Sequence, residues 1–97
     1  MTVKVLAEFN CADGNADKFI EICQNIFPVT REFHGCSHID ISAAQEDPNR
    51  PIMTENWASK EHHLKYLKYR TNDGNLEKLV ALLASPPEIT YFDLSDA

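Results

Sequence analysis

The chain has 97 residues, of which 43% are hydrophobic and 25% charged, and its formal net charge is −6 at pH 7. This composition is typical of a folded globular protein and excludes an intrinsically disordered chain. The acidic balance argues against a nucleic-acid partner, because the phosphate backbone would be repelled. The length fits one domain over 1–97 with a modest core, which a partner subunit would extend.

Neither a membrane segment nor a disulfide framework is expected. No apolar run approaches the roughly 20 residues of a membrane-spanning helix, and the first residues lack the apolar core and cleavage region of a signal peptide. Cys11, Cys23 and Cys36 are odd in number and widely spaced, without a CxxC pair, which favours reduced thiols. We therefore expect a cytoplasmic protein without a membrane partner.

The first third of the chain predicts a strand and a helix. Apolar residues alternate over 3–11 as in a strand, and Leu6 makes the second face of that strand partly apolar as well. Helical spacing follows over 16–33, where Pro28 is expected to bend the helix because it lacks a backbone N–H. Both faces of the first strand are therefore expected to be covered.

The middle of the chain predicts a hairpin followed by a short helix. Alternation over 36–43 and 52–57 indicates two strands, and the polar segment 45–51 is the loop between them. Ser59 is a favourable N-cap for a helix over 60–69. This places the helix directly after the second hairpin strand.

The last third predicts one more helix and one more strand. Apolar residues recur at helical spacing over 76–83, and Pro86–Pro87 separate this helix from a strand over 89–94. The order β-α-β-β-α-α-β is that of a ferredoxin-like α+β fold, in which an antiparallel sheet carries helices on one face. The uncovered sheet face predicts a homodimer that pairs two copies.

Several short motifs follow one another in a specific order. They are Thr30, Arg31, Gly35 and Cys36 (T-R-x-x-x-G-C), Asp47–Pro48, then Glu55, Trp57, Ser59 and Glu61 (E-x-W-x-S-x-E), and Pro86–Pro87. In this order, over 2–94, they resemble the antibiotic biosynthesis monooxygenase family. The resemblance implies a dimeric α+β barrel and cofactor-independent oxygenation of a quinol or polycyclic phenol, in which the substrate supplies the electrons to dioxygen.

The chain departs from this family at two positions. Many members carry a histidine nine residues after the tryptophan, where this chain has Tyr66, so a mechanism based on that histidine does not transfer. Haem-degrading relatives carry an asparagine on the first strand, and the equivalent position here is Phe9, which argues against haem cleavage. No Gly-rich phosphate loop is present either, so we expect neither a nucleotide nor a flavin, and no cofactor.

The candidate site is the stretch MTENWASKEHHLKYLKYR over 53–70, which holds the only tryptophan and two of the four histidines. Helical spacing divides its helix into a buried centre, an edge and an outward face. These are, in turn, Leu64 and Leu67; His63, Tyr66 and Arg70; and His62, Lys65 and Tyr69. The edge predicts one wall of an apolar pocket for a planar aromatic ligand that carries hydroxyl or keto oxygens.

Each residue of this pocket has an expected role. We expect His63 to be the catalytic base or a donor, and Tyr66 and Arg70 to be catalytic partners of the substrate oxygens. The expected substrate-binding residues are Trp57, which stacks on the rings, Glu55 and Phe9. The partners are an aromatic small molecule and dioxygen.

Other interpretations of these residues stay open. Trp57 can be ordinary core, with His63 and Tyr66 at its boundary. The basic residues at 60, 65, 68 and 70 either attract an anionic ligand or form a solvated face. The spacing of His34, Cys36 and His38 resembles a metal site, but no further ligand is marked, so no metal is expected. The competing function is a dimer that only binds a small molecule or acts as an isomerase.

Overall fold

The computed structural model describes residues 2–95, so Met1, Asp96 and Ala97 of the expected domain lie outside the described residues. The elements are β1 (Val3–Glu8), α1 (Ala16–Glu32), β2 (Cys36–Ala43), β3 (Pro51–Trp57), α2 (Lys60–Asn72), α3 (Asn75–Val80) and β4 (Glu88–Asp93). This is the order predicted from the sequence, and it confirms the ferredoxin-like α+β fold.

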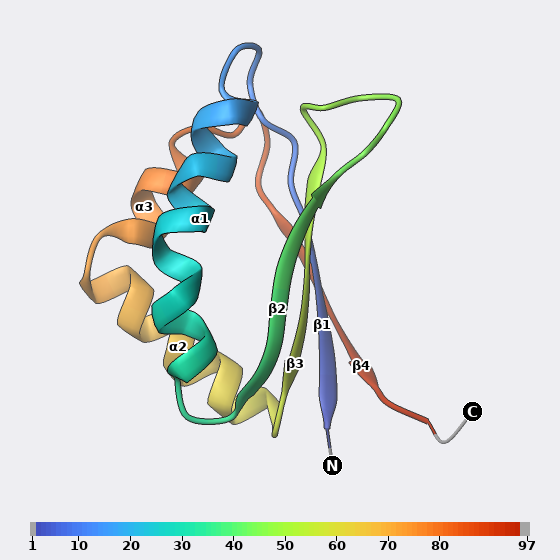
Figure 1. Cartoon of the computed structure of the whole chain (residues 1–97), viewed down its shortest axis with the longest axis vertical. Coiled ribbons are helices and arrows are strands. Elements are labelled where there is room, and N and C mark those ends of the chain that lie inside the picture. Colours follow the sequence, from blue (N-terminus) through green and yellow to red (C-terminus); the bar gives the residue numbers. More distant parts are fainter. Residues whose placement is uncertain (1, 96–97) are drawn as a thin grey trace.

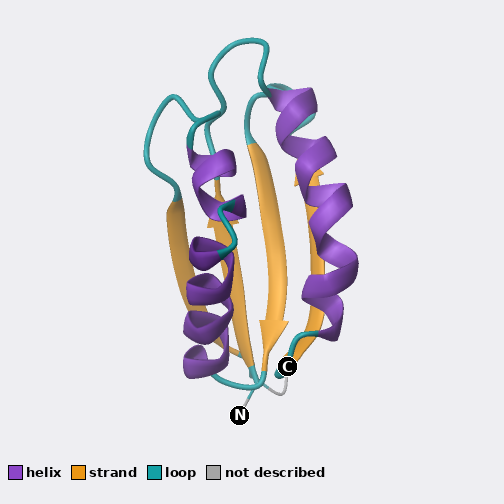
Figure 2. Cartoon of the chain, turned by 90° about the vertical axis from the view of Figure 1, so that its left-hand side faces the viewer, coloured by secondary structure: helices purple, strands orange, loops and turns teal. Residues whose placement is uncertain are grey.

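The four strands form one antiparallel sheet in the order β2-β3-β1-β4. Figure 1 shows all three helices on one side of this sheet. In Figure 2 the helices lie in front of the strands, with the long α1 along one side and the shorter α2 and α3 along the other. Among residues 2–95, no helix lies on the opposite face of the sheet, as predicted.

The core lies between the sheet and the helices. Alternate strand residues such as Val5 and Met53 point toward the helices and are buried, which follows from the two-residue period of a strand. Phe19, Cys23 and Phe27 meet them from α1 at helical spacing. Burial of an apolar side chain between valine and phenylalanine in size stabilises the fold by roughly 1.5–3 kcal/mol.

Three predicted boundaries differ from the observed ones by more than one residue. β1 ends at Glu8 instead of residue 11, because Cys11 makes only an isolated bridge to Leu83. α2 extends beyond residue 69 to Asn72, and α3 stops at Val80 instead of 83. Beyond Val80 the chain turns with i→i−3 hydrogen bonds, and the carbonyl of residue 82 accepts hydrogen bonds from the backbone N–H of residue 12 and from the side chain of residue 15.

The connection between α1 and β2 explains the glycine of the T-R-x-x-x-G-C motif. Gly35 has a φ of +93°, a left-handed conformation that disfavours side chains, and a Cβ at this position would lie 2.5 Å from the ring of His62. The prediction that His62 faces outward is therefore wrong, since its half-buried ring covers Gly35. Ser59 caps α2 as predicted, with its hydroxyl accepting from the His62 N–H over 3.2 Å.

The cysteines and the helices bear on the predictions of reduced thiols and of no membrane segment. Cys11 and Cys23 are buried and Cys36 is half-buried, and all three are free thiols. Within residues 2–95, no helix has both the length and the apolar character needed to cross a membrane.

Candidate functional site

The buried face of α2 carries polar and aromatic side chains. His63, Tyr66 and Arg70 are 2%, 6% and 5% exposed, and their spacing keeps them on one helix face. The assignment of Leu64 to the centre of this face is wrong, because Leu64 is 47% exposed and Leu67 only half-buried. His63, Tyr66 and Arg70 are buried instead, because each has a hydrogen-bond partner beneath the helix.

A cavity lies between this face of α2, the short α3 and the sheet. Sixteen residues line it and twelve of them are apolar, the four others being Glu55, His63, Tyr66 and Arg70. Phe9 belongs to the apolar wall, so five of the six expected site residues surround one space. The cavity measures about 60 Å³, which is room for a few water molecules.

Strand register brings a carboxyl group beneath His63. Ile39 of β2 pairs with Glu55 of β3, and Glu55 pairs with Val5 of β1. Val5 in turn pairs with Tyr91 of β4, so the four residues form one row across the inner face of the sheet. His63 spans this row: its Nε2 lies 3.6 Å from Glu55 Oε1, and its Nδ1 lies 2.8 Å from the Tyr91 hydroxyl.

Burial opposes charge on both members of the Glu55–His63 pair. It raises the pKa of Glu55 to about 7, an effect that the indole N–H of Trp57 partly offsets by donating to Oε1 over 2.9 Å. Burial lowers the pKa of His63 to about 4. Between these pH values the pair holds one proton on the carboxyl group and no net charge. Above about pH 7 it is free to accept a proton.

Arg70 joins α2 to α1 through a network of hydrogen bonds. Its Nη2 donates to the Ile26 carbonyl oxygen over 2.8 Å and to Thr30 Oγ1 over 3.0 Å. Its Nε donates to the Tyr66 hydroxyl over 2.9 Å, and Nη1 donates to Asp73 Oδ2 over 2.9 Å. The hydroxyls of Thr30 and Tyr66 lie 2.7 Å apart and share a hydrogen bond. Most hydrogen-bonding capacity of Arg70 and Tyr66 is thus used between the helices.

Trp57 lies behind the cavity wall and does not line it. The residue is fully buried, with ring centroids 5.2 Å from Tyr66, 5.5 Å from His63 and 6.2 Å from Phe33. Its Nε1 donates to Glu55 Oε1. In this position Trp57 supports two residues of the wall and orients the carboxyl group.

The three residues with metal-like spacing have separate contacts. The ring of His34 lies 5.0 Å from that of His62, while His38 Nε2 lies 2.8 Å from Asp40 Oδ2. The Cys36 thiol is directed at the backbone carbonyl of His38. Among residues 2–95, no three side chains of histidine, cysteine, aspartate or glutamate are arranged to hold a metal ion.

Tyr91 and Thr30 also contact the candidate site residues, which the sequence did not indicate. The available signal for Tyr91 was alternation in β4, which puts it on the inner face with Ile89. Thr30 stood out only as a motif residue, because its partner Tyr66 is 36 positions further along the chain. Both assignments require knowledge of how α2 packs on the sheet and on α1.

The same fold occurs in many solved structures. A conserved protein from Methanosarcina mazei Go1 superposes with a TM-score of 0.86 at 17% identity, covering 95% of this chain and 91% of that chain. Rv0793 from Mycobacterium tuberculosis gives 0.86 at 16% identity, covering 100% and 98%. A variant of SnoaB, a cofactor-independent oxygenase from Streptomyces nogalater, gives 0.83 at 14% identity, covering 99% and 95%. At these identities the likeness establishes the fold.

No curated protein sequence matches the chain, but a family does. The model of the family described as antibiotic biosynthesis monooxygenase matches residues 2–71. This range includes β1 to β3 and nearly all of α2, and with them Glu55, His63, Tyr66 and Arg70. Motif residues within it have clear structural roles, since Thr30 binds Arg70 and Gly35 makes room for a ring. The chain therefore belongs to the antibiotic biosynthesis monooxygenase family.

Proposed function

We propose that this protein is a cofactor-independent monooxygenase that oxidises a quinol or another phenolic small molecule. The observation that carries the proposal is the Glu55–His63 pair, whose Oε1 and Nε2 lie 3.6 Å apart at the wall of a mainly apolar cavity. An apolar cavity suits aromatic rings, and a few polar groups within it orient the oxygens of a ligand. Membership of the family supports the same reaction class.

The pair suits the role of a general base. The carboxyl pKa of about 7 lies near the pH at which the enzyme would work, where a base is most effective. His63 alone, with a pKa lowered to about 4 by burial, is a weak base. Next to ionised Glu55 its Nε2 becomes more basic, because the protonated ring then faces an opposite charge. We therefore assign His63 and Glu55 to proton transfer as a unit.

The reaction needs no other electron donor than the substrate. His63 accepts the proton of a ring hydroxyl, and the resulting anion reduces dioxygen and forms a carbon–oxygen bond at a ring C–H position. Loss of water from this hydroperoxide leaves a carbonyl group: one oxygen atom stays in the product, and the other departs in water with two hydrogens from the substrate. The proton held by the pair returns to the departing oxygen, so the base is restored in each cycle.

The remaining expected site residues receive supporting roles in this proposal. Phe9 is part of the apolar wall that would contact the substrate rings. Tyr66 and Arg70 face the cavity but spend their hydrogen bonds on the α1–α2 network, so we assign them to shaping the wall. Trp57 orients Glu55 instead of stacking on the substrate.

An isomerase is the second candidate, and a specific observation favours it. The groups assigned to the reaction transfer protons only, which would be sufficient to move a hydrogen between a carbon and an oxygen of a keto–enol substrate. The cavity volume of about 60 Å³ also favours small substrates. Even a single aromatic ring needs more room than this, so its binding would require movement of exposed rim residues such as Val80 and Ile89.

Oxygen uptake by chelator-treated protein tests the proposal. A panel from monocyclic quinols to anthrones should contain a substrate that consumes dioxygen without added flavin, haem or metal. His63→Ala should lower kcat by roughly 10²-fold with little change in substrate affinity, because proton transfer contributes about this factor. Lys65→Ala is the matched control, since Lys65 is exposed on the same helix. Substrate conversion without oxygen uptake would support the isomerase and overturn the monooxygenase.

We also propose that two copies pair through the sheet face without helices. That face exposes Ile52 of β3 and Phe92 of β4 by 37% and 46%, and Leu6 of β1 lies half-buried between these strands. Pairing would remove these apolar side chains from water. Light scattering should give about twice 11.0 kDa. Leu6→Asp should give monomer or unfolded chain, because it would bury a charge, and a monomeric wild-type protein would contradict the dimer.

A further inference from the structure

We propose that the substrate site continues from the cavity into an open cleft at the end of the sheet. The substrate would then be a long phenol or quinol that carries an uncharged, hydroxyl-bearing substituent at the end remote from the reacting ring. The inference rests on the proposed function, because it extends the site of the Glu55–His63 pair. It also accounts for the small volume of the cavity itself, about 60 Å³.

The cleft lies where three segments of the chain meet, after β1, between β2 and β3, and before β4. Figure 1 shows these segments together at the top of the sheet. The cleft measures about 420 Å³, which is within the size range of small-molecule sites. Its lining residues are Glu8, Phe9, Asn10, Arg50, Ser85, Pro86, Pro87 and Glu88.

Backbone hydrogen bonds hold the walls of the cleft together. The N–H of Phe9 donates to the carbonyl of Pro51 over 3.1 Å, which joins the end of β1 to the start of β3. The N–H of Ala84 donates to the carbonyl of Asn10 over 2.7 Å, which joins the same segment to the connection before β4. The cleft is therefore formed before any ligand binds, as small-molecule sites usually are.

Phe9 and Pro87 separate the cleft from the cavity, since both residues line both spaces. Both are half-buried. Pro87 stands two residues before Ile89, one of the exposed rim residues whose movement would admit a ring. Neither Pro86 nor Pro87 has a backbone N–H that could hold this segment to a neighbouring strand. The movement that admits a ring would therefore also join the cavity to the cleft.

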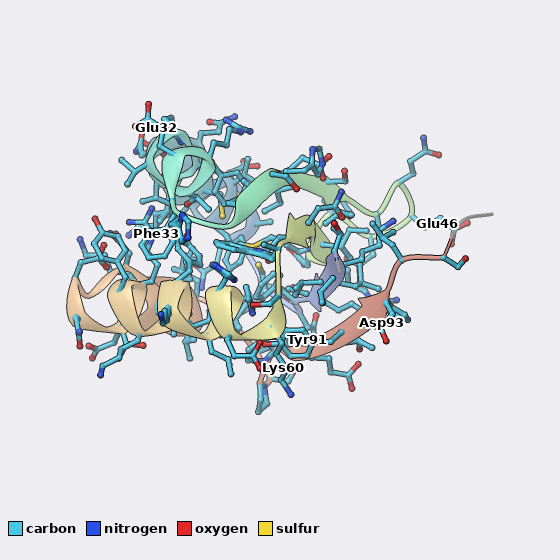
Figure 3. All side chains as sticks on the ribbon, turned by 90° about the horizontal axis from the view of Figure 1, so that it is seen from below. Glu32, Phe33, Glu46, Lys60, Tyr91 and Asp93 are labelled. Carbon is cyan, nitrogen blue, oxygen red and sulfur yellow. The ribbon has the colours of Figure 1, made fainter. Side chains whose placement is uncertain are left out.

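The opposite end of the cavity is covered by side chains in contact with one another. The Tyr91 hydroxyl lies 2.8 Å from His63 Nδ1, and Lys60 Nζ lies 4.8 Å from the centroid of the Tyr91 ring. Figure 3 looks at the molecule from this end and shows Lys60 beside Tyr91. A ligand whose ring lies at the Glu55–His63 pair would therefore extend toward Phe9.

The length of the sheet between these places sets the length of the ligand. Glu55 pairs with Val5 in the sheet, and Phe9 follows Val5 by four residues. At roughly 3.3 Å per strand residue, the two positions are about 13 Å apart. A single quinol ring does not span this distance, whereas linked rings with a further substituent do.

The cleft is more polar than the cavity. Five of its eight lining residues are polar or charged, namely Glu8, Asn10, Arg50, Ser85 and Glu88. Within residues 2–95, Arg50 forms no ion pair, so its guanidinium keeps donors for a ligand. The two carboxylates only accept hydrogen bonds, whereas a hydroxyl group both donates and accepts. An uncharged substituent with several hydroxyl groups, such as a sugar, therefore matches this lining.

An NMR titration under nitrogen tests the inference without requiring turnover. The probes are para,para′-biphenol and its monoglucoside, which share the phenolic rings and differ in the substituent. The glucoside should shift the amide signals of Asn10 and Ser85 together with those of Glu55 and His63, whereas biphenol should shift only the second pair. Glucoside shifts confined to one of the two pairs, or absent from both, would overturn the continuous site.

Affinities measure what the cleft contributes. The glucoside should bind about 10-fold more tightly than biphenol, the effect of about two additional hydrogen bonds. Arg50→Gln should reduce this preference to about threefold and leave the affinity for biphenol unchanged. Lys18→Gln is the matched control, because it removes the same charge from an exposed position on α1. Equal affinities for the two probes, or tighter binding of an analogue with an ammonium group in place of the sugar, would overturn the assignment to hydroxyl groups.

Oxygen uptake separates this inference from the proposed function. Binding of the glucoside across both spaces, without oxygen uptake from any phenol or quinol, would support the extended site and reject the monooxygenase. Oxidation of a quinol by a protein whose Asn10 and Ser85 signals do not respond to the glucoside would support the monooxygenase and reject the extended site.

Discussion

The two ends of the buried face of α2 both carry polar side chains, but these side chains make different contacts. At the C-terminal end, Arg70 and Tyr66 form hydrogen bonds to Thr30 and to the backbone of α1. At the N-terminal end, His63 faces Glu55 at 3.6 Å, and burial shifts their two pKa values in opposite directions. Both ends line the same cavity.

The difference teaches which buried polar groups are available for a reaction. A network whose members all have partners stabilises one packing of the helices, and a substrate would have to break it to gain a hydrogen bond. A pair that keeps an unshared oxygen or nitrogen at a cavity retains its capacity to move protons. We therefore expect the Arg70 end to maintain the fold and the Glu55–His63 end to perform the chemistry.

The largest expected effect concerns the Arg70 end. Arg70→Met should lower the free energy of unfolding by about 3–5 kcal/mol, because it removes the buried guanidinium that donates to the Tyr66 hydroxyl, the Ile26 carbonyl and Thr30 Oγ1. For a chain of this length the Tm should fall by at least about 10 °C. Lys68→Met on the exposed face of α2 is the control. A loss below about 1 kcal/mol would show that the network does not stabilise the helix packing.

The pH dependence of stability separates the two members of the Glu55–His63 pair. In His63→Gln, the remaining Glu55 binds its proton more tightly in the folded state, since its pKa is about 7 there and 4.5 in the unfolded chain. The free energy of unfolding, measured relative to a variant that lacks both groups, should therefore be highest below pH 4.5. It should fall by about 3 kcal/mol as the pH rises through 7.

Glu55→Gln should give the opposite slope. His63 has a folded pKa of about 4 against 6.5 when unfolded, so stability should be full above pH 6.5 and fall by about 3 kcal/mol as the pH drops through 4. In the wild type the free energy of unfolding should not change with pH between 4.5 and 6.5 on account of this pair. The reason is that the folded pair and the unfolded pair each bind one proton in that range. Chemical denaturation across pH 4 to 8 measures these slopes, and equal slopes in both variants would contradict the assignment.

A milder change tests whether Tyr66 belongs to the network alone. Tyr66→Phe removes only the hydroxyl that bonds Thr30 and Arg70, which should cost about 1–3 kcal/mol of stability. Turnover per folded molecule should stay within about threefold, an effect of under 1 kcal/mol on the barrier. Loss of turnover by a factor of 100 would instead make Tyr66 a partner of the substrate oxygens.

The smallest effect is expected on the outer face of α2. Leu64 is 47% exposed, so Leu64→Ala should lower the free energy of unfolding by less than about 1 kcal/mol, whereas a fully buried leucine would lose about 2–5 kcal/mol. Thermal unfolding of this variant tests which face of α2 packs on the sheet.

The architecture was predictable from the sequence because its signals are local. Alternation in β1 and β3, the Ser59 cap and the helical spacing of α1 depend on neighbouring residues, and they determined the order of elements. The motif of Thr30 and Gly35 identified the family for the same reason. Boundaries were less accurate, since Cys11 and Leu83 lie beyond the ends of β1 and α3 and pair with each other across distant segments.

The sequence indicated which polar residues lie together at the cavity, and much less which contacts they make. Glu55, His63, Tyr66, Arg70 and Phe9 do surround one cavity. Which of them keeps a free polar atom depends on α1, which supplies Thr30 to Arg70, and on β4, which supplies Tyr91 to His63. Helix periodicity also failed on α2, because its polar residues have partners beneath the helix and therefore bury more deeply than its leucines.

The central claim is the division of labour along α2, and oxygen uptake per folded molecule tests it most directly. The measurement compares chelator-treated wild type, His63→Gln and Tyr66→Phe with the same quinol under air, at a temperature where all three are folded. The account predicts a loss of roughly 10²-fold for His63→Gln and a rate within about threefold of wild type for Tyr66→Phe. Equal rates for His63→Gln and wild type, or a greater loss in Tyr66→Phe, would contradict it.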